Sequence, residues 1–192
     1  LAYEAARPRL PKPMHGKPPA RRINTLADIA EAFDVFLLDA FGVLNVGESA
    51  IAGVPARVRD LQAAGKRVLV VSNAASVPRE ALVQKYARLG YDIAPEDIIT
   101  SRSATIAGMA GAADVLWGVM GLSDETMQEF GPINWRPLRD DPADYMAADG
   151  ILMISTGDWT PARQDMLVRA LTARPRPIRV ANPDIVAPRD HG

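Results

Sequence analysis

The chain has 192 residues, a formal net charge of −1, two histidines and no cysteine, and 48% of its residues are hydrophobic. This composition is that of a globular protein of one domain, or of one domain and part of another, and its near-neutral charge gives no broad nucleic-acid footprint. The lack of cysteine excludes disulfides, thiolate catalysis and Cys-ligated zinc. The placement of His15 and His191 near the two ends argues against a Ser-His-Asp triad, and no apolar run reaches the roughly 18 residues that a membrane span requires.

Residues 1–22 are basic and rich in proline. They carry six basic side chains and one acidic one, together with five of the 16 prolines, whereas the rest of the chain is acidic. Proline at this density interrupts helices and central strands. We therefore expect residues 1–23 to form a loose arm ahead of the fold, either solvated or docked on a partner. The arm has no apolar core of a secretory signal, so we expect a cytoplasmic protein, and because the chain begins with Leu1 we expect residues upstream.

The rest of the chain alternates between strand and helix patterns. A short helix capped by Thr25 precedes the apolar run Val35–Leu38, which predicts a buried strand. The later predicted strands are 68–71, 115–120, 151–154 and 178–181, and the later helices are 55–65, 78–90 and 161–173. Strands separated by helices predict an α/β protein with a parallel sheet.

Polar residues follow the first two strands, where a parallel sheet binds its ligands. Asp39 ends the first strand and precedes Gly42, and Ser72 and Asn73 end the second. A carboxylate can attack phosphorus or hold Mg²⁺, Gly42 allows a close turn around a ligand, and a hydroxyl beside backbone amides can bind phosphate. The alternative is that Asp39 only ends its strand and caps the next loop.

Other phosphate and nucleophile motifs do not occur. The sequence has no Gly-x-Gly-x-x-Gly after a strand, no Gly-x-x-x-x-Gly-Lys-Ser/Thr and no Gly-x-Ser-x-Gly. These absences argue against dinucleotide-dependent enzymes, P-loop NTPases and α/β-hydrolases.

Three segments together resemble the haloacid dehalogenase superfamily: residues 34–44 (DVFLLDAFGVL), residues 68–73 (VLVVSN) and residues 181–184 (ANPD). The resemblance covers roughly residues 24–187 and is closest to the large-cap subgroup, which includes nucleotide, sugar-phosphate, phosphoglycolate and pyridoxal-phosphate phosphatases. It implies a Rossmann-like parallel-sheet core with an inserted α/β cap. We expect the core over residues 24–109 and the cap over residues 110–192, incomplete at its C-terminus.

The resemblance also implies roles for individual residues. Asp39 matches the nucleophile that forms an aspartyl-phosphate and ligates Mg²⁺, and Phe41 matches the position whose backbone carbonyl contacts the metal. Ser72 and Asn73, with the turn at Gly42, match the phosphate-binding elements. Asn182 and Asp184 match the part of the cap that faces the active site and selects substrates.

The sequence departs from the family pattern in two ways. The family usually has a second Asp where this chain has Phe41, and a phenyl ring has no proton to give to a leaving group. The family also uses a later lysine and a later acidic metal motif, but the last lysine is Lys85 and no such motif follows Asp184. We expect the C-terminal part of the core to lie outside this chain, and residues 1–192 alone to give no turnover.

Three function classes remain. The first is an Mg²⁺-dependent phosphomonoester hydrolase that acts on a small phosphorylated metabolite, with no nucleic-acid or membrane partner and with self-association through the cap. The second is a phosphate-binding protein of the same fold that has lost turnover, because of Phe41. The third is a receiver-like domain with Asp39 as phosphoacceptor. It is the weakest, because residues 36–38 offer no extra acidic group and a single receiver domain leaves residues 151–184 unexplained.

Overall fold

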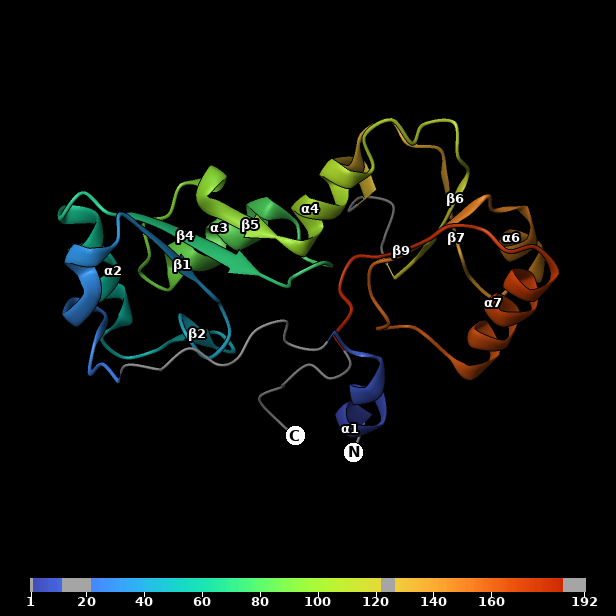
Figure 1. The fold of residues 1–192 in the computed structure, drawn as a ribbon. Helices are drawn as coiled ribbons and strands as arrows, with labels where there is room; N and C mark the ends of the chain where they lie inside the picture. The colour runs from blue at the N-terminus through green and yellow to red at the C-terminus, as the bar shows by residue number, and fades with distance from the viewer. Residues whose placement is uncertain (1, 12–21, 122–126, 185–192) are drawn as a thin grey trace.

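The computed structural model describes residues 2–11, 22–121 and 127–184, which form two α/β units side by side (Figure 1). The first unit contains a parallel sheet of β1 (Val35–Leu38), β4 (Arg67–Ser72) and β5 (Ile98–Thr100), in the order β1-β4-β5. Between the strands run α2 (Val54–Ala63) and α3 (Arg79–Arg88). The predicted strands 35–38 and 68–71 and the helices that follow them are confirmed within two residues.

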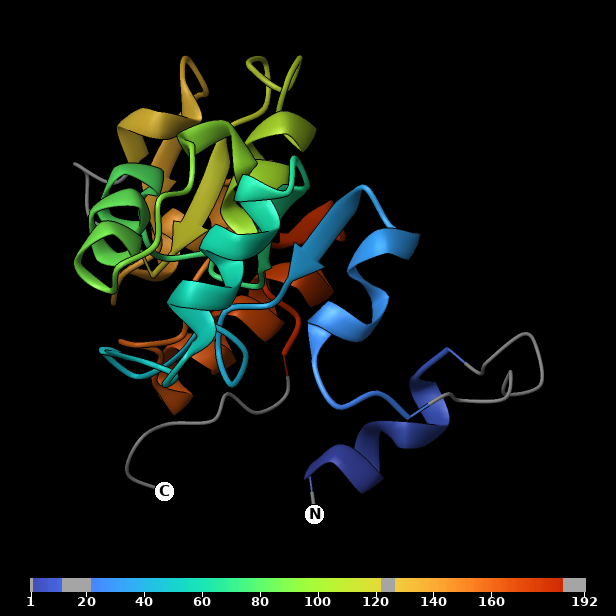
Figure 2. The same ribbon diagram turned by 90° about the vertical axis from the view of Figure 1, so that its left-hand side faces the viewer.

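One face of this first sheet forms the core of the unit. Phe36 and Leu38 pack against side chains of α2 and α3. The alternate residues Val35 and Leu37 are 50% and 65% exposed, so the expectation of a fully buried first strand is wrong. The reason is that, within the described residues, α2 and α3 cover only the other face of the sheet. Figure 2 shows β1, in blue, at the edge of this sheet.

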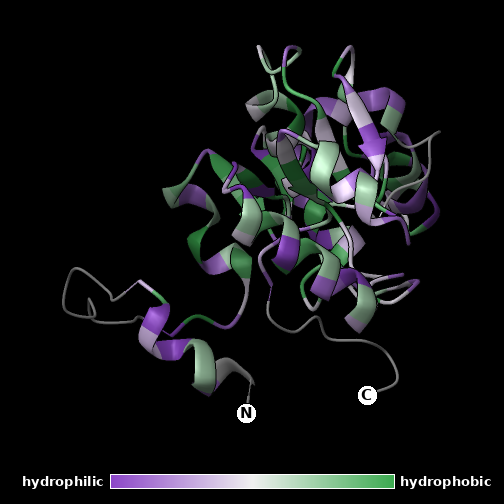
Figure 3. Cartoon of the chain, turned by 90° about the vertical axis from the view of Figure 1, so that its right-hand side faces the viewer, coloured by the Kyte–Doolittle hydropathy of each residue, from purple (hydrophilic) through white to green (hydrophobic). Residues whose placement is uncertain are grey.

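The second unit is a four-stranded parallel sheet. Its strands are β6 (Trp117–Met120), β7 (Trp135–Pro137), β8 (Gly150–Met153) and β9 (Ile178–Val180), in the order β7-β6-β8-β9. The helices α6 (Pro142–Ala147) and α7 (Pro161–Ala173) pack on one face, and Met109 and Phe130 belong to the core on the other. The inner strands β6 and β8 are buried on both faces, as expected for a parallel sheet covered on two sides. Figure 3 shows hydrophobic segments, in green, gathered in the interior.

Shorter elements connect and flank these sheets. The 3-10 helix η2 (Leu26–Ala32) begins at Thr25 with a capping box completed by Asp28, as the cap prediction required. The others are the hairpin of β2 (Asn45–Val46) and β3 (Ser49–Ala50), the 3-10 helices η3 (Pro95–Asp97) and η4 (Gln128–Phe130), and α4 (Ser101–Gly108).

The N-terminal segment differs from the expected loose arm. Residues 2–9 form α1 (Ala2–Ala6) and the 3-10 helix η1 (Arg7–Arg9). The first five residues of this segment lack proline and are mostly alanine, which favours helix, and Pro8 lies in the first turn of η1, where its missing N–H is tolerated. Residues 12–21 of the expected arm lie outside the described residues. None of the described helices is long and apolar enough to cross a membrane.

Candidate active site

A cavity of about 810 Å³ lies between the two units, at the carboxyl ends of β1 and β4. The chain after β9 returns to this space from the second unit (Figure 1). Both units contribute to the wall, which is lined by Asp39, Phe41, Asn73, Ala74, Ala75, Ser76, Met153, Ile154, Ser155, Thr156, Val180, Asn182 and Asp184. Five of the residues predicted from the sequence are therefore brought together, namely Asp39, Phe41, Asn73, Asn182 and Asp184.

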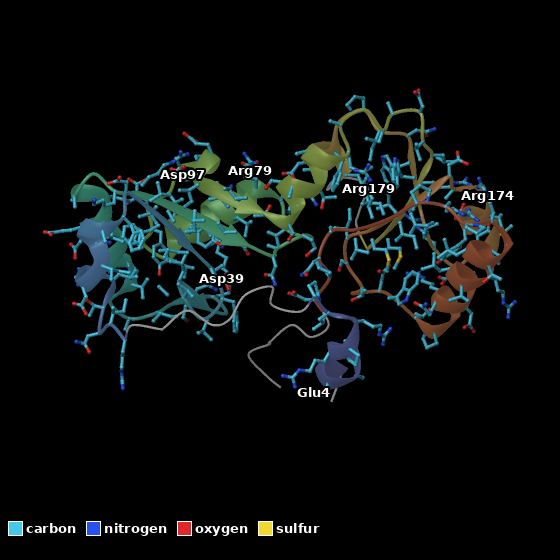
Figure 4. The ribbon with its side chains drawn as sticks, in the orientation of Figure 1. Glu4, Asp39, Arg79, Asp97, Arg174 and Arg179 are labelled. Atoms are coloured by element: carbon cyan, nitrogen blue, oxygen red, sulfur yellow. The ribbon has the colours of Figure 1, made fainter. Side chains whose placement is uncertain are left out.

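The loop after β1 presents Asp39 to the cavity (Figure 4). The Ala40 N–H donates a hydrogen bond of 2.7 Å to Asp39 Oδ1, which orients the carboxylate. The Ala40 carbonyl accepts hydrogen bonds from the N–H groups of residues 43, 44 and 45, so the chain turns back at once. Gly42 has φ +77°, a conformation that other residues adopt only with strain, and this explains the glycine at that position. Gly42 does not line the cavity.

Two buried side chains that the sequence analysis did not identify hold this loop. The Tyr91 hydroxyl donates a hydrogen bond of 2.5 Å to the Leu44 carbonyl, and the Asn45 side-chain amide donates one of 2.7 Å to the Gly47 carbonyl. The neighbouring Tyr86 ring packs edge-on against Tyr91. Burial raises the pKa of the Tyr86 phenol, and the Asp39 carboxylate raises that pKa further. Asparagine is common in turns, but neither it nor a tyrosine shows from sequence which carbonyl its side chain will bond, so these contacts were not indicated.

Residues 73–76, in the loop after β4, line the cavity, whereas Ser72 does not. The Ser72 hydroxyl instead accepts a hydrogen bond of 3.2 Å from the Ala74 N–H, and it shapes the turn that brings Asn73 to the wall. A phosphate contact by Ser72 stays a prediction.

The second unit contributes two segments to the cavity. Asn182 and Asp184 follow β9, and the Asp184 N–H donates a hydrogen bond of 2.9 Å to Asn182 Oδ1. The Asn73 side-chain amide donates a hydrogen bond to the Asp184 carboxylate, which joins the two walls. Ser155 and Thr156 follow β8 and add two hydroxyl groups that the sequence analysis missed, although their place after a predicted strand was a usable signal.

Phe41 lies in the wall of the cavity with 40% of its surface exposed. Its ring offers neither a proton nor a metal ligand, so only its backbone carbonyl can contact a cation. Among the described lining residues, Asp39 and Asp184 carry carboxyl groups and none is Lys, Arg or His. A phosphate group entering this cavity therefore meets negative charge unless a cation accompanies it.

The donor set of the cavity suits Mg²⁺. Carboxylate, amide and carbonyl oxygens are hard ligands, and Mg²⁺ commonly binds through one or two carboxylates while it keeps several waters and contacts substrate phosphate. Within the described residues no three His, Cys, Asp or Glu side chains converge on one point, so those residues form no all-protein cage. Asp39 and the Phe41 carbonyl fit such a partly hydrated metal, with Asp184 in the same cavity.

Sequence comparison finds similarity to a hydrolase family over the first unit and the start of the second. Residues 36–130 match the profile of a family described as haloacid dehalogenase-like hydrolase. The chain is 40% identical over 76 residues to human glycerol-3-phosphate phosphatase, and 29% identical over 87 residues to the chloroplastic phosphoglycolate phosphatase 1A of Arabidopsis thaliana. These matches cover 38% and 45% of this chain but only 24% of either relative.

Solved structures show the same fold over most of the chain. A hypothetical protein from Pyrococcus horikoshii matches with a TM-score of 0.68 and 23% identity, covering 83% of this chain and 62% of that one. A glycerol phosphate phosphatase from Mycobacterium tuberculosis, in complex with calcium, matches with a TM-score of 0.66 and 23% identity, over 85% of this chain and 47% of that one. A 4-nitrophenylphosphatase from Thermotoga maritima matches with a TM-score of 0.69 and 18% identity, over 85% and 60%. The chain thus spans about half to two thirds of these structures.

Proposed function

Because residues 36–130 belong to the haloacid dehalogenase-like hydrolase family, we propose that the whole protein is an Mg²⁺-dependent phosphomonoester hydrolase. The observation that carries this proposal is the Asp39 carboxylate, fixed by the Ala40 N–H and directed into a cavity that both units line. Residues 24–109 would then be the core and residues 110–192 the cap, with a boundary next to the end of α4.

In the proposed reaction, an Asp39 oxygen attacks the phosphorus of the substrate and the bond from phosphorus to the leaving-group oxygen breaks. The leaving oxygen takes a proton, and water then hydrolyses the aspartyl-phosphate, which releases phosphate and restores the carboxylate. Asp39 and the Phe41 carbonyl would hold Mg²⁺, and the bound metal would neutralise charge on the phosphoryl oxygens. In this reaction the side-chain amide of Asn73, directly after β4, donates a hydrogen bond to the same oxygens.

The leaving group needs a proton donor other than residue 41. Asp184 carries the second carboxyl group among the described lining residues and lies on the wall opposite the first sheet. We infer that Asp184 supplies this proton and that Asn182, Ser155 and Thr156 contact the leaving group. These polar neighbours and the names of the relatives favour a small metabolite, such as a phosphorylated polyol or hydroxy acid.

A second candidate is a phosphate-binding protein without turnover. Phe41 favours it, because general acid–base help is typically worth about 10²–10⁴-fold in rate and this ring cannot give it. Cytoplasmic location and self-association through residues 110–192 stay predictions under either candidate.

The test is hydrolysis of p-nitrophenyl phosphate by the whole protein, with and without Mg²⁺. Wild type should release phosphate only with the metal, and Asp39→Asn should lower the rate by about 10³-fold or more, as expected for loss of a nucleophile. Asp165→Asn on α7 is the matched control, because it removes the same charge from an exposed site outside the cavity. Near wild-type rates in Asp39→Asn would reject the nucleophile role. Binding of inorganic phosphate without turnover would support the second candidate.

A further inference from the structure

Arg102 is a buried cation in the first turn of α4, with only 2% of its surface exposed. A positive charge opposes the helix dipole at this end, so its position needs compensating contacts. Its guanidinium donates to a Glu129 carboxylate oxygen and, over 3.3 Å, to the Ala75 carbonyl, and it lies 4.9 Å from the centre of the Phe130 ring. The Arg102 backbone N–H donates a hydrogen bond of 3.1 Å to the Ala74 carbonyl.

Glu129 completes the arrangement from the second unit. One of its carboxylate oxygens accepts from Arg102, and the other accepts a hydrogen bond of 3.3 Å from the Arg79 N–H at the start of α3. Glu129 lies in η4, next to Phe130, which belongs to the core beneath the second sheet. Ala75 belongs to that same core although it follows β4 of the first sheet.

The segment held by these contacts is a wall of the cavity. Residues 74–76 line the cavity on one side, and the carbonyls of Ala74 and Ala75 accept the two bonds from Arg102. The start of α3, which closes this loop, is bonded to Glu129. A shift of η4 relative to the first unit would therefore displace the loop that follows Asn73.

We propose that Arg102 and Glu129 are a positioning pair that fixes the loop 73–76 beside Asp39 and links the placement of this loop to the second unit through η4. For its effect on phosphate the inference rests on the proposed function. The inference that the pair holds the loop does not rest on the proposed function, because these contacts exist whether or not the protein hydrolyses a substrate. Arginine suits this role, because its planar guanidinium donates hydrogen bonds to both Glu129 and the Ala75 carbonyl while its face lies against the Phe130 ring.

The first experiment measures backbone amide exchange in the full chain. Glu129→Gln keeps the size of the side chain and an acceptor oxygen but removes the negative charge. Arg102→Lys keeps the positive charge but loses the planar guanidinium that donates to two acceptors at once. Both variants should speed exchange of amides 74–79, among which Pro78 has no N–H, by about 10-fold while the amides of β8 keep their wild-type rates, because only the local opening changes. Asp97→Asn is the matched control. It removes one charge from the Arg67–Asp97 pair, which lies at the start of β4, whereas Asn73 and the cavity lie beyond its end.

The second experiment measures inorganic phosphate binding to the whole protein in the presence of Mg²⁺, together with KM and kcat for p-nitrophenyl phosphate. Loop displacement should weaken phosphate binding and raise KM by about 10-fold in Glu129→Gln, with a smaller change in kcat, because the loop positions the phosphate. Asp97→Asn should change neither value.

The outcomes separate the two proposals. Unchanged exchange of amides 74–79 in both variants, or exchange raised equally throughout the chain, would overturn the positioning pair, since a purely structural role moves all amides together. Failure of wild type to bind or hydrolyse phosphate would reject the proposed function, while faster local exchange would still support the hold on the loop. If a variant exchanges these amides faster but binds phosphate as tightly as wild type, the proposed effect of the pair on phosphate binding is overturned.

Discussion

The side-chain amide of Asn73 donates a hydrogen bond to the carboxylate of Asp184, although 111 residues separate them in the chain. Asn73 directly follows β4 of the first sheet, and Asp184 follows β9 of the second. The bond therefore ties the two walls of the cavity at the level of the strand ends, beside Asp39. It also places one oxygen of Asp184, a residue that lines the cavity, against an amide donor.

Replacing Asp184 should distinguish a tether from a proton donor. Asp184→Asn keeps a carbonyl oxygen that can accept from Asn73 but has no acidic proton. If Asp184 protonates the leaving group, alkyl phosphates should lose about 10²-fold or more in kcat, while p-nitrophenyl phosphate, whose leaving group needs little protonation, should lose much less. The measurement is kcat on both substrate classes with the whole protein.

The control for this prediction is Asp149→Asn, which removes an exposed carboxylate that pairs with Arg174 away from the cavity. It should leave both rates at wild-type values. Equal losses on aryl and alkyl phosphates in Asp184→Asn would mean that Asp184 only joins the walls.

Gly121 controls the position of the hydroxyl-bearing loop after β8. Its φ is +79°, and a Cβ at this position would lie 2.2 Å from the Ser155 carbonyl oxygen. Gly121→Ala should therefore destabilise the protein by about 2 kcal/mol or more and raise KM, because the backbone of Ser155 must move. The measurements are urea unfolding and steady-state kinetics.

Gly111→Ala supplies the matched control for Gly121. Gly111 has the same φ of +79° but nothing within 4 Å of an added Cβ, so it reports the backbone strain alone. Equal destabilisation by the two variants, with an unchanged KM for Gly121→Ala, would show that the close approach to Ser155 has no effect on the site.

The strand ends were predictable because each depends on a short stretch of sequence. Asp39 and Asn73 directly follow apolar runs that became β1 and β4, and helix 161–173 was predicted with the bounds observed for α7. β5 (Ile98–Thr100) was missed, since three residues are too few to show a period. β7 (Trp135–Pro137) was missed because proline disfavours strands, and the proline is tolerated here because β7 lies at a sheet edge.

Contacts between distant segments were not predictable in the same way. No sequence pattern indicated that Arg102 is buried, because Glu129 and the carbonyl of Ala75, which make its burial tolerable, come from distant segments. The bond between Asn73 and Asp184 depends equally on how the second unit packs against the first. The sequence thus indicated which residues end the strands, while the tertiary structure determines which of them meet.

Acid should weaken the attachment of α7. Arg163 donates hydrogen bonds of 2.8 and 3.0 Å to the two carboxylate oxygens of Asp140, and these bonds lower the pKa of that carboxyl. A lowered folded-state pKa gives stability that is present above the unfolded pKa of the carboxyl and is lost as the pH falls through the folded value. Asp140→Asn should therefore lower the free energy of unfolding at neutral pH, and the difference from wild type should shrink toward acid.

Urea unfolding of both proteins from pH 7 to pH 3 measures this difference. The Asp140 side chain is 73% exposed, so the effect should be small and should decrease in high salt. Asp165→Asn is the control, because Asp165 makes no ion pair within the described residues of α7 and its surroundings. A difference between Asp140→Asn and wild type that stays constant down to pH 3 would contradict the assignment.

Phe41 should limit the reaction where the leaving group needs a proton. The ring lies in the cavity wall with Asp39 and cannot donate, so wild type should prefer aryl over alkyl phosphates steeply unless Asp184 supplies the proton. Phe41→Asp should raise alkyl-phosphate turnover by up to about 10²-fold if the new carboxyl reaches the leaving oxygen. Phe41→Asn is the matched control, because it has the same size as Asp but no acidic proton.

If Asp184 already supplies the proton, Phe41→Asp should leave the aryl-to-alkyl ratio unchanged or lower both rates, since another negative charge then crowds Asp39. Equal wild-type rates on the two substrate classes would show that Phe41 does not weaken the acid step.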